Sequence, residues 1–435
     1  MERRLFNDLL EWKKGIDRKP LILRGARQVG KTWLMKEFGR RVYRNCAYIN
    51  FEGNERMARL FSADLDVSRI LTGLRVETAC SIDPSDTLLI FDEVQEVPKA
   101  LGSLKYFQEN APQYHIIAGG SLLGIALHQG TSFPVGKVAF LDLHPLTFSE
   151  FLEALGKQNL LELLYRGDWK LVHQFKESYI DLLRSYFCVG GMPEAVASFV
   201  DRRDFLEARI ILERLLQAYE QDFSKHAPPA AVPRIRQIWN SMPAQLAREN
   251  RKFVYGLIRE GARAREYETG LQWLCDCGLA SKLFRVTKPG LPLKAYEDPG
   301  VFKLFMHDVG LLAAQSGLPV QAVLDGNRLF EEFKGALTEQ FVFQQLASRK
   351  DLSLYYWSSG TATAEIDFLI QDGTHIFPLE VKAGENLQAK SLKVFRDSYA
   401  PERCFRTSLS SFREEGWLTN IPLYAVEFLM RPYEP

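Results

Sequence analysis

The fold of this chain is decided by one stretch near its start, Gly25-Ala26-Arg27-Gln28-Val29-Gly30-Lys31-Thr32. Its spacing is G-x-x-x-x-G-K-T, in which two glycines let backbone N–H groups turn inward around phosphate oxygens. An apolar run at 20–24 precedes the stretch and an amphipathic run at 32–40 follows it. We therefore predict a strand, a phosphate-binding loop and a helix, the start of a nucleotide-binding module.

Each position of this loop has an expected role. Lys31 would reach the β- and γ-phosphates of ATP, and the Thr32 hydroxyl would bind Mg²⁺ at the N-terminus of the helix, where the dipole favours anions. The nucleotide contacts are predicted to come from the whole loop and the residue after it: Gly25, Ala26, Arg27, Gln28, Val29, Gly30, Lys31, Thr32 and Trp33.

A second apolar run, 87–91, ends in two carboxylates, Asp92 and Glu93. Asp92 would hold Mg²⁺ through its water shell, and Glu93 would orient and activate the attacking water. The alternative is a buried strand that ends in a solvated acidic turn. Ser121 follows a further apolar run, 115–118, and could sense the γ-phosphate, although Gly-Gly-Ser is also an ordinary turn.

Strand-like and helical segments alternate over the first 150 residues, which predicts a parallel sheet with helices on both faces. The expected strands are 20–24, 47–51, 87–91, 115–118 and 138–143. Beyond this α/β domain at 1–150 we predict a helical connector at 151–230, a winged-helix-like module at 231–325 and a mixed α/β domain at 326–435.

Composition excludes several classes of protein. The net charge of +1 over 435 residues gives no overall basic excess, so any nucleic-acid surface must be local. The six cysteines have no zinc spacing. No signal peptide and no apolar run of membrane-spanning length is found, so we expect a cytoplasmic protein without membrane contacts.

The winged-helix-like module carries a local basic cluster. Aromatic residues are interleaved with its cations, which are Arg234, Arg236, Arg248, Arg251, Lys252, Arg259, Arg263 and Arg265. Such a surface could supply sequence-independent phosphate contacts to DNA. The alternative is a helical bundle with an aromatic core and solvated cations.

The segment 365–382 is predicted to form a β-hairpin turning at Asp372-Gly373. With Gln371 paired to Thr374, Asp367 would lie opposite Pro378 and diagonal to Glu380. Alternation would then place Glu365, Asp367, Glu380 and Lys382 on one face and apolar residues on the other. Two carboxylates and a lysine in this order could hold Mg²⁺ and stabilise a pentacovalent phosphate.

Four segments together resemble the prokaryotic AAA-family ATPases joined to a DUF4143 domain: 25–32, 88–95, 117–123 and 144–151. Tyr186 to Glu194 and Lys334 to Glu339 resemble signatures of the second part of that family. The resemblance implies an AAA-like three-layer ATPase core, a winged helix and a C-terminal domain related to restriction endonucleases.

The order Asp367, Glu380, Lys382 resembles the PD-(D/E)xK nucleases, in which Glu339 would be a further acidic metal ligand. The metal ligands implied are therefore Thr32 and Asp92 in the ATPase part, and Glu339, Asp367 and Glu380 in the C-terminal part. The same pattern is also typical of an inactive nuclease-like domain, or of a solvated strand face with a surface ion pair.

The sequence departs from the family at Gly136-Lys137, where members often have Gly-Arg. Lys137 would replace a bidentate arginine poorly, and Arg27 is another candidate cation, so the arginine finger stays open. The leading hypothesis is an ATP-driven protein that processes or remodels DNA, with a nucleotide-dependent homo-oligomer as a possible form. The alternative is a nucleotide-gated switch or scaffold whose nuclease-like domain only binds.

Overall fold

The computed structural model describes most of the chain, namely residues 1–84, 86–120, 134–248, 252–326, 328–359, 364–385 and 388–430. Contacts divide the chain into two units. The N-terminal unit comprises Glu2–His144 and Asp276–Leu279, and the C-terminal unit comprises Pro145–Cys275 and Ala280–Pro435. None of the described helices combines the length and apolarity needed to cross a membrane.

The N-terminal unit is built on a five-stranded parallel sheet of order β2-β3-β4-β1-β5. Its strands are β1 (Leu21–Arg24), β2 (Asn45–Asn50), β3 (Thr87–Asp92), β4 (His115–Gly119) and β5 (Ala139–Asp142). Every residue of β3 and β4 is buried, as expected for central strands of a parallel sheet covered on both faces. The predicted parallel sheet is therefore confirmed.

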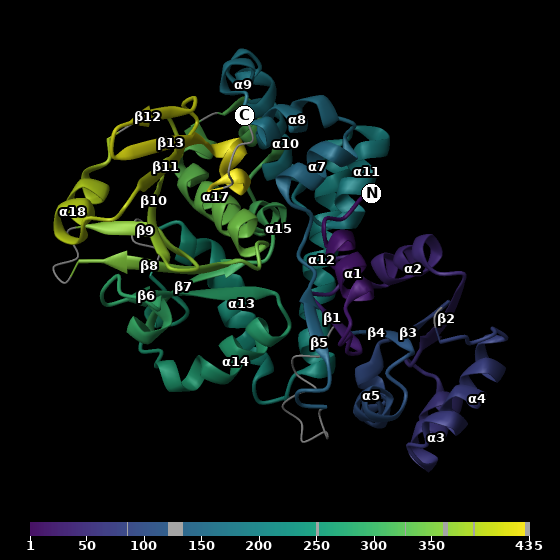
Figure 1. The fold of residues 1–435 in the computed structure, drawn as a ribbon. Coiled ribbons are helices and arrows are strands. Elements are labelled where there is room, and N and C mark those ends of the chain that lie inside the picture. Colours follow the sequence, from purple (N-terminus) through teal and green to yellow (C-terminus); the bar gives the residue numbers. More distant parts are fainter. Residues whose placement is uncertain are drawn as a thin grey trace. The chain divides into compact units, whose positions relative to one another are not determined.

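Helices cover both faces of this sheet (Figure 1). On one face lie α1 (Leu5–Lys14) and α2 (Lys31–Val42), and on the other lie α3 (Glu55–Ala63), α4 (Val67–Thr78) and α5 (Pro98–Asn110). A hydrophobic core lies between the second face and its helices, and it includes Phe61 of α3, Leu74 of α4 and Phe107 of α5. Because β1 and β3 run parallel in this sheet, their carboxyl ends lie at the same end of the sheet.

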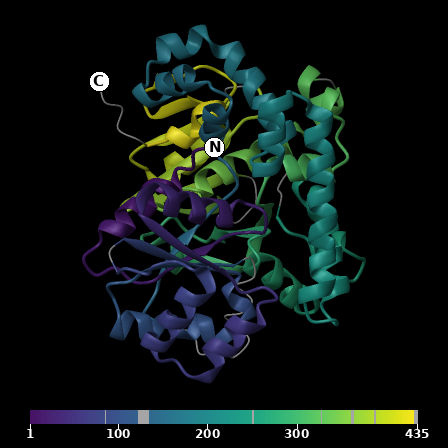
Figure 2. The same cartoon turned by 90° about the vertical axis from the view of Figure 1, so that its right-hand side faces the viewer.

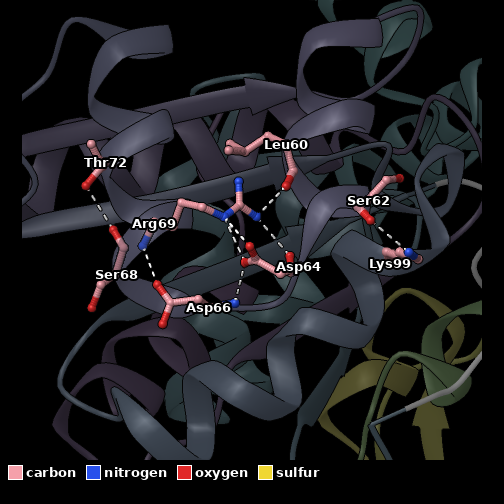
Figure 3. Close-up of polar contacts among 8 residues, drawn as sticks. All are labelled: Leu60, Ser62, Asp64, Asp66, Ser68, Arg69, Thr72 and Lys99. Carbon is pink, nitrogen blue, oxygen red and sulfur yellow. Dashed lines mark hydrogen bonds and ion pairs between the residues drawn. The ribbon is translucent and has the colours of Figure 1, made fainter.

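The turn between α3 and α4 is fastened by polar contacts (Figure 3). Arg69 donates to the Asp64 carboxylate at 2.7 and 2.8 Å and to the Leu60 carbonyl at 2.8 Å. Asp66 caps α4 by accepting from the Arg69 backbone N–H at 2.7 Å. Lys99 of α5 donates to the Ser62 carbonyl at 2.9 Å. These contacts satisfy backbone groups that helix ends leave unpaired.

The C-terminal unit begins with a run of helices. They are α7 (Phe148–Ala154), α8 (Gln158–Arg166), α9 (Trp169–Gln174), α10 (Lys176–Val189), α11 (Pro193–Arg202) and α12 (Phe205–His226). Figure 2 shows α12 nearly side-on as a long helix. The predicted helical connector is therefore divided into several short helices before α12; α7 and α8, for example, are separated at Gly156, whose φ is 73°.

The middle of the chain contains two α-helices and a β-hairpin. These are α13 (Val232–Leu246), α14 (Ala264–Asp276), β6 (Ala280–Val286) and β7 (Glu297–Met306), with β6 and β7 antiparallel. Strand β6 also pairs in parallel with β8 (Leu352–Ser358). The hairpin of the predicted winged-helix-like module therefore belongs to the same sheet as the C-terminal strands.

That sheet has eight strands in the order β12-β13-β11-β10-β9-β8-β6-β7. The remaining strands are β9 (Glu365–Asp372), β10 (His375–Val381), β11 (Cys404–Ser408), β12 (Arg413–Glu415) and β13 (Leu418–Pro422). Helix α17 (Arg328–Ala347) packs on the sheet through Phe343, which stacks on Phe305. Helix α18 (Lys390–Tyr399) joins a separate core cluster through Leu392 and Phe395. Two short helices, α15 (Val309–Gln315) and α16 (Val320–Asp325), precede α17.

Candidate functional site

The glycine loop connects β1 to α2 in the N-terminal unit. Gly25 and Gly30 have φ values of 147° and 94°, in the region that favours glycine, and Gln28 also has a positive φ of 64°. A Cβ atom at Gly25 would lie 2.3 Å from the carbonyl oxygen of Leu143. Glycine at position 25 is therefore required both by conformation and by the close approach of the chain after β5.

Lys31 is the first residue of α2 and is almost completely buried. Its ammonium group donates to the loop's own carbonyls, Gly25 at 2.8 Å and Ala26 at 2.7 Å. Burial lowers the pKa of Lys31 to about 8, while the nearby charges of Glu93 and Asp92 partly oppose this shift. The ammonium thus lies inside the loop, where it can exchange carbonyl contacts for phosphate contacts.

Thr32 and Asp92 meet across the loop and the end of β3. The Thr32 hydroxyl donates to Asp92 Oδ2 at 2.8 Å, and the hydroxyl of Tyr48 donates to the same oxygen at 2.9 Å. Tyr48 lies on β2, the strand paired with β3, and no sequence motif indicated it. Hydroxyl and carboxylate oxygens are the donors that Mg²⁺ prefers, so this pair fits the ion that accompanies ATP.

Glu93 follows directly after β3 and has a positive φ of 50°. Its side chain accepts a hydrogen bond of 2.6 Å from the amide of Gln95. The backbone N–H of Glu93 donates to Asp92 Oδ1 at 3.2 Å. The two predicted carboxylates are therefore held in different directions, one toward Thr32 and the other toward Gln95.

Arg3 anchors the loop from outside, a role that the sequence did not indicate. Its buried guanidinium donates to the carbonyls of Val29 at 3.0 Å and His144 at 2.5 Å. The loop and the segment after β5 are thereby tied to the start of the chain. A lone arginine before the first helix carries no spacing pattern that would reveal this contact.

The other predicted nucleotide-site residues differ in exposure. Ala26 and Val29 are buried, whereas Trp33 on α2 is exposed. Ser121 lies outside the described residues. Lys137, one of the two cations considered in place of an arginine finger, forms an ion pair with Glu109 of α5 at 3.0 Å. This cation thus has a partner within its own chain.

The predicted C-terminal hairpin exists as β9 and β10, but its register differs by two residues. Asp372 pairs with His375 and Leu369 with Pro378, so the turn is Gly373-Thr374 and not Asp372-Gly373. The ladder ends at the Phe368–Leu379 pair, and beyond it the Asp367 carboxylate accepts from the Val381 backbone N–H at 2.8 Å. Asp367 therefore lies beside the end of β10, close enough for its charge to act on Glu380.

The expected division of this hairpin into an apolar face and a charged face is wrong in one respect. The β8–β9 ladder contains an irregularity between Tyr355 and Trp357. In a regular strand Ile366 and Leu369 would lie on opposite faces. Because of the irregularity, both join the core cluster under α18. Glu380 is also buried rather than solvated. Helices on both faces, and not on one, cover these strands.

The acidic residues of this region surround a lysine. Lys303 of β7 has no solvent exposure, and its Nζ atom lies 2.8 Å from Glu339 Oε1 and 2.7 Å from Glu365 Oε1. Asp367 Oδ1 lies 4.0 Å away, and its other oxygen accepts from the backbone N–H of Val381 at 2.8 Å. The predicted metal ligands Glu339 and Asp367 therefore lie beside a protein ammonium group.

Glu380 belongs to a different pair. Its carboxylate lies 2.6 Å from Nζ of Lys382. Burial raises the pKa of Glu380, the neighbouring Lys382 lowers it, and the charge of Asp367 raises it further. Among the described residues, no group of three histidine, cysteine, aspartate or glutamate side chains is placed to hold a metal ion. As placed, the C-terminal donors do not fit Mg²⁺.

In the middle module the aromatic residues and the cations separate. Trp239, Phe253, Tyr267 and Trp273 are buried. The described cations are all exposed, and they are Arg234, Arg236, Arg248, Lys252, Arg259, Arg263 and Arg265. Aromatic stacking on bases is therefore not available from the buried rings, whereas the cations face solvent.

The Gly190-Gly191 pair of the second signature has a structural role. Gly191 N–H donates to the buried Asp308 carboxylate at 2.6 Å, and a Cβ atom at Gly191 would lie 2.1 Å from the Leu146 carbonyl oxygen. A Cβ atom at Gly190 would lie 2.9 Å from Gly310 Cα. The glycines thus let three backbone segments cross closely.

Glutamines of α17 complete this junction. Gln344 donates to Asp308 at 3.0 Å and accepts from the Val309 backbone at 2.8 Å. Gln345 accepts from the Phe148 backbone at 2.7 Å, and Gln340 exchanges two bonds with the Met306 backbone. The connector, the middle module and the C-terminal domain therefore share one buried polar network.

Comparison with protein families gives three matches along the chain. An AAA domain matches residues 17–152, a domain of unknown function (DUF8612) matches 180–322, and a domain of unknown function (DUF4143) matches 334–425. The signature Tyr186 to Glu194 falls in the second match, and Lys334 to Glu339 falls in the third. No curated protein matches the chain.

Comparison with solved structures finds partial similarity to the following three proteins, among others. The Walker-type ATPase PABY2304 of Pyrococcus abyssi is 16% identical with a TM-score of 0.47, covering 72% of this chain and 95% of its own. The ORC1 protein of Aeropyrum pernix, solved in complex with DNA, is 16% identical with a TM-score of 0.30, covering 74% and 92%. Cdc6p from Pyrobaculum aerophilum is 11% identical with a TM-score of 0.24, covering 74% and 92%.

The matched AAA domain coincides with the parallel sheet, the glycine loop and the Thr32–Asp92 contact described above. The chain therefore joins an AAA domain, which makes it an ATPase, to the domains DUF8612 and DUF4143.

Proposed function

We propose that this ATPase uses its nucleotide cycle to clamp or remodel DNA. In this proposal ATP and Mg²⁺ bind at the glycine loop, the middle module contacts the DNA backbone, and the C-terminal domain is PD-(D/E)xK nuclease-like. Gripping DNA, rather than cutting it, is the activity that the geometry of the C-terminal domain supports best.

The observation that carries the ATP-driven part is the contact between Thr32 and Asp92, with Glu93 beside it. Thr32 and Asp92 would hold Mg²⁺, which neutralises charge between the β- and γ-phosphates. Lys31 would bind the phosphates, and Glu93, once released from Gln95, would orient the attacking water. All of these groups belong to one edge of one sheet, as a hydrolysing site requires.

The DNA part of the proposal is supported by the exposed cations of the middle module. Arg265 lies in the first turn of α14, and Arg263 and Arg259 lie just before this helix. Exposed arginines bind phosphate oxygens and release counterions, which gives affinity without sequence preference. Because four of the interleaved aromatic rings are buried and Tyr255 is partly buried, we expect contacts to the backbone of duplex DNA rather than stacking on single-stranded bases.

The nuclease-like part is supported by the hairpin β9–β10 in a mixed sheet and by the closeness of Asp367 and Glu380. Cutting would need a divalent ion held by Glu339, Asp367 and Glu380. Since Glu339 and Asp367 lie at Lys303 while Glu380 pairs with Lys382, cutting receives less support than gripping.

The proposal is tested by fluorescence anisotropy of a labelled duplex at low salt, with ATP, with ADP and without nucleotide. Glu93→Gln should bind DNA as tightly as wild type and hold the ATP state, whereas Lys31→Ala should lose the dependence on nucleotide. If no DNA binding is found at low salt with ATP present, the proposed function is wrong.

A second candidate function is a nucleotide-gated switch or scaffold that regulates a partner protein. Lys303 is the specific observation that favours it, because a nuclease-like domain without metal would only bind. Plasmid nicking with Mg²⁺ or Mn²⁺ separates the candidates from a nuclease. Nicking that is lost in both Asp367→Ala and Lys382→Ala would support cutting, and its absence in wild type would support binding alone.

A further inference from the structure

The cluster around Lys303 combines groups from four elements of the C-terminal unit. The lysine lies on β7, Glu339 on α17, and Glu365 and Asp367 on β9. The ring of Tyr356 on β8 lies under the ammonium, with its centroid 5.0 Å from Nζ. The cation is therefore enclosed by two carboxylates at hydrogen-bonding distance, a third nearby and an aromatic face.

Glu339, the fully buried carboxylate of this cluster, needs a neighbouring cation. Lys303 and Glu339 both have no solvent exposure, and they are 2.8 Å apart. An ionised carboxylate in such a place needs a cation or several hydrogen-bond donors, because burial removes it from bulk solvent. Glu365 is partly exposed at 26%, so solvent reaches only the outer side of the cluster. Lys303 thus neutralises the buried charge of Glu339.

Lys303 and a divalent ion would compete for one position. Mg²⁺ requires oxygens at about 2.0–2.1 Å in near-octahedral arrangement. The oxygens of Glu339 and Glu365 instead lie at ammonium distances from Nζ, and the second oxygen of Asp367 is used by the Val381 backbone. An ion could bind between these carboxylates only if the lysine left.

We propose that Lys303 is the resident cation of the C-terminal carboxylate cluster and makes this site independent of divalent metal. The inference deepens the proposed function and rests on its nuclease-like C-terminal domain. Lys303 belongs to the hairpin of the middle module, so the part that would contact DNA also supplies the cation. The ion pair therefore holds β7 to α17 and β9 and leaves the domain unable to hydrolyse a phosphodiester through bound metal.

Counting bound Mn²⁺ by electron paramagnetic resonance tests this in the full-length, nucleotide-free protein. Every variant carries Asp92→Asn, which removes the metal ligand of the ATPase site. We expect no bound Mn²⁺ in this background. Adding Lys303→Gln frees the carboxylates, and we expect about one Mn²⁺ per chain and a thermal unfolding midpoint that rises with Mn²⁺. Adding Asp367→Asn as well should abolish both effects.

The matched control is Lys334→Gln, which removes a lysine of α17, the helix that carries Glu339. Lys334 pairs with the exposed Glu331. It should bind no Mn²⁺. Mn²⁺ bound in the Asp92→Asn background and lost on adding Asp367→Asn would overturn the proposal. So would a folded Lys303→Gln variant that binds none, or plasmid nicking by wild type that depends on Mn²⁺ and Asp367.

Failure of this inference is distinguishable from failure of the proposed function. If Lys303→Gln does not fold, the Mn²⁺ count in the Asp92→Asn background still decides the question. If the protein binds no DNA, the proposed function fails, whereas the count of Mn²⁺ at the carboxylate cluster is unaffected.

Discussion

The hydroxyl of Thr32 donates a 2.8 Å hydrogen bond to Asp92, joining the glycine loop to the end of β3. The two residues are 60 positions apart in the chain. They meet because β1 and β3 are parallel strands of one sheet, with β4 between them, and their carboxyl ends lie at the same edge. This contact links the glycine loop to β3, and the Tyr48 hydroxyl donates a second hydrogen bond to the same Asp92 oxygen.

Tyr48→Phe removes one donor to Asp92 and retains the ring. Without this hydrogen bond Asp92 is less well oriented, and we expect the free energy of Mg²⁺ binding to weaken by about 1 kcal/mol. The Mg²⁺ concentration that gives half-maximal ATPase activity should therefore rise about 5-fold. Titration of activity with Mg²⁺ at saturating ATP measures it. Tyr106→Phe, at an exposed tyrosine of α5, is the control. Equal Mg²⁺ titrations for both variants and wild type would contradict a role for Tyr48.

The pKa of Lys31, lowered to about 8 by burial, predicts a pH dependence of ATP binding. Below this pKa the amine is protonated and can bind phosphate; as pH rises through about 8 the neutral fraction grows and affinity should fall. Bound ATP favours the ammonium, so binding near pH 8 should take up protons. Calorimetric titration in buffers of different ionisation enthalpy measures that uptake, and uptake retained in Lys31→Arg, whose guanidinium stays protonated, would assign it to another group.

Glu93→Gln should reduce the rate of ATP hydrolysis by roughly 10²–10⁴-fold while leaving ATP binding intact, because an amide cannot activate water. Size-exclusion chromatography with light scattering of this variant, with and without ATP, tests the proposed nucleotide-dependent homo-oligomer. A monomer of unchanged size in both states would argue against an oligomeric motor.

Lys137 pairs with Glu109 within its own chain, so Lys137→Ala should alter the ATPase rate little.

Arg263→Ala with Arg265→Ala should weaken DNA binding about equally for unrelated duplexes. If both arginines contact phosphates, the slope of log affinity against log salt should fall by about 2, since each contact contributes about 0.9. The matched control is Lys14→Ala with Arg166→Ala, which removes the same charge at exposed positions of α1 and α8. Equal loss in both pairs would indicate a general charge effect and no DNA surface on the middle module.

Gly191→Ala should destabilise the C-terminal unit by about 1–3 kcal/mol, because the added methyl group would collide with the Leu146 carbonyl. Gly384→Ala is the control: among the residues that the structure describes, apart from its two chain neighbours, none has an atom within 4 Å of the position that its Cβ would take, so its effect should stay within about 0.5 kcal/mol. Urea unfolding followed by circular dichroism compares their midpoints. A Gly191→Ala midpoint equal to that of the control would show that the crossing can relax.

The sequence by itself determined the local elements and the nucleotide loop. Hydrophobic runs and glycine positions encode strands and turns within a few residues, so β1 to β5 and the start of α2 were found close to their observed bounds. The hairpin itself was predicted, and its register error of two residues does not by itself exchange the two faces, because the side-chain period of a strand is also two. The irregularity in the β8–β9 ladder, which places Ile366 and Leu369 in one core cluster, was not predicted. The burial of Glu380 was not found, since alternation does not reveal which faces are later covered by helices.

Only the tertiary structure decided the partners of the charged groups. The three contacts that the sequence did not indicate join residues far apart in the chain. Their separations range from 26 to 64 residues, and the pairs are Arg3–Val29, Tyr48–Asp92 and Lys303–Asp367. No spacing rule connects such residues, because their contacts depend on strand order and helix packing rather than on local periodicity. The nucleotide loop could therefore be predicted from the sequence, whereas the cation beside the C-terminal carboxylates could be found only in the folded chain.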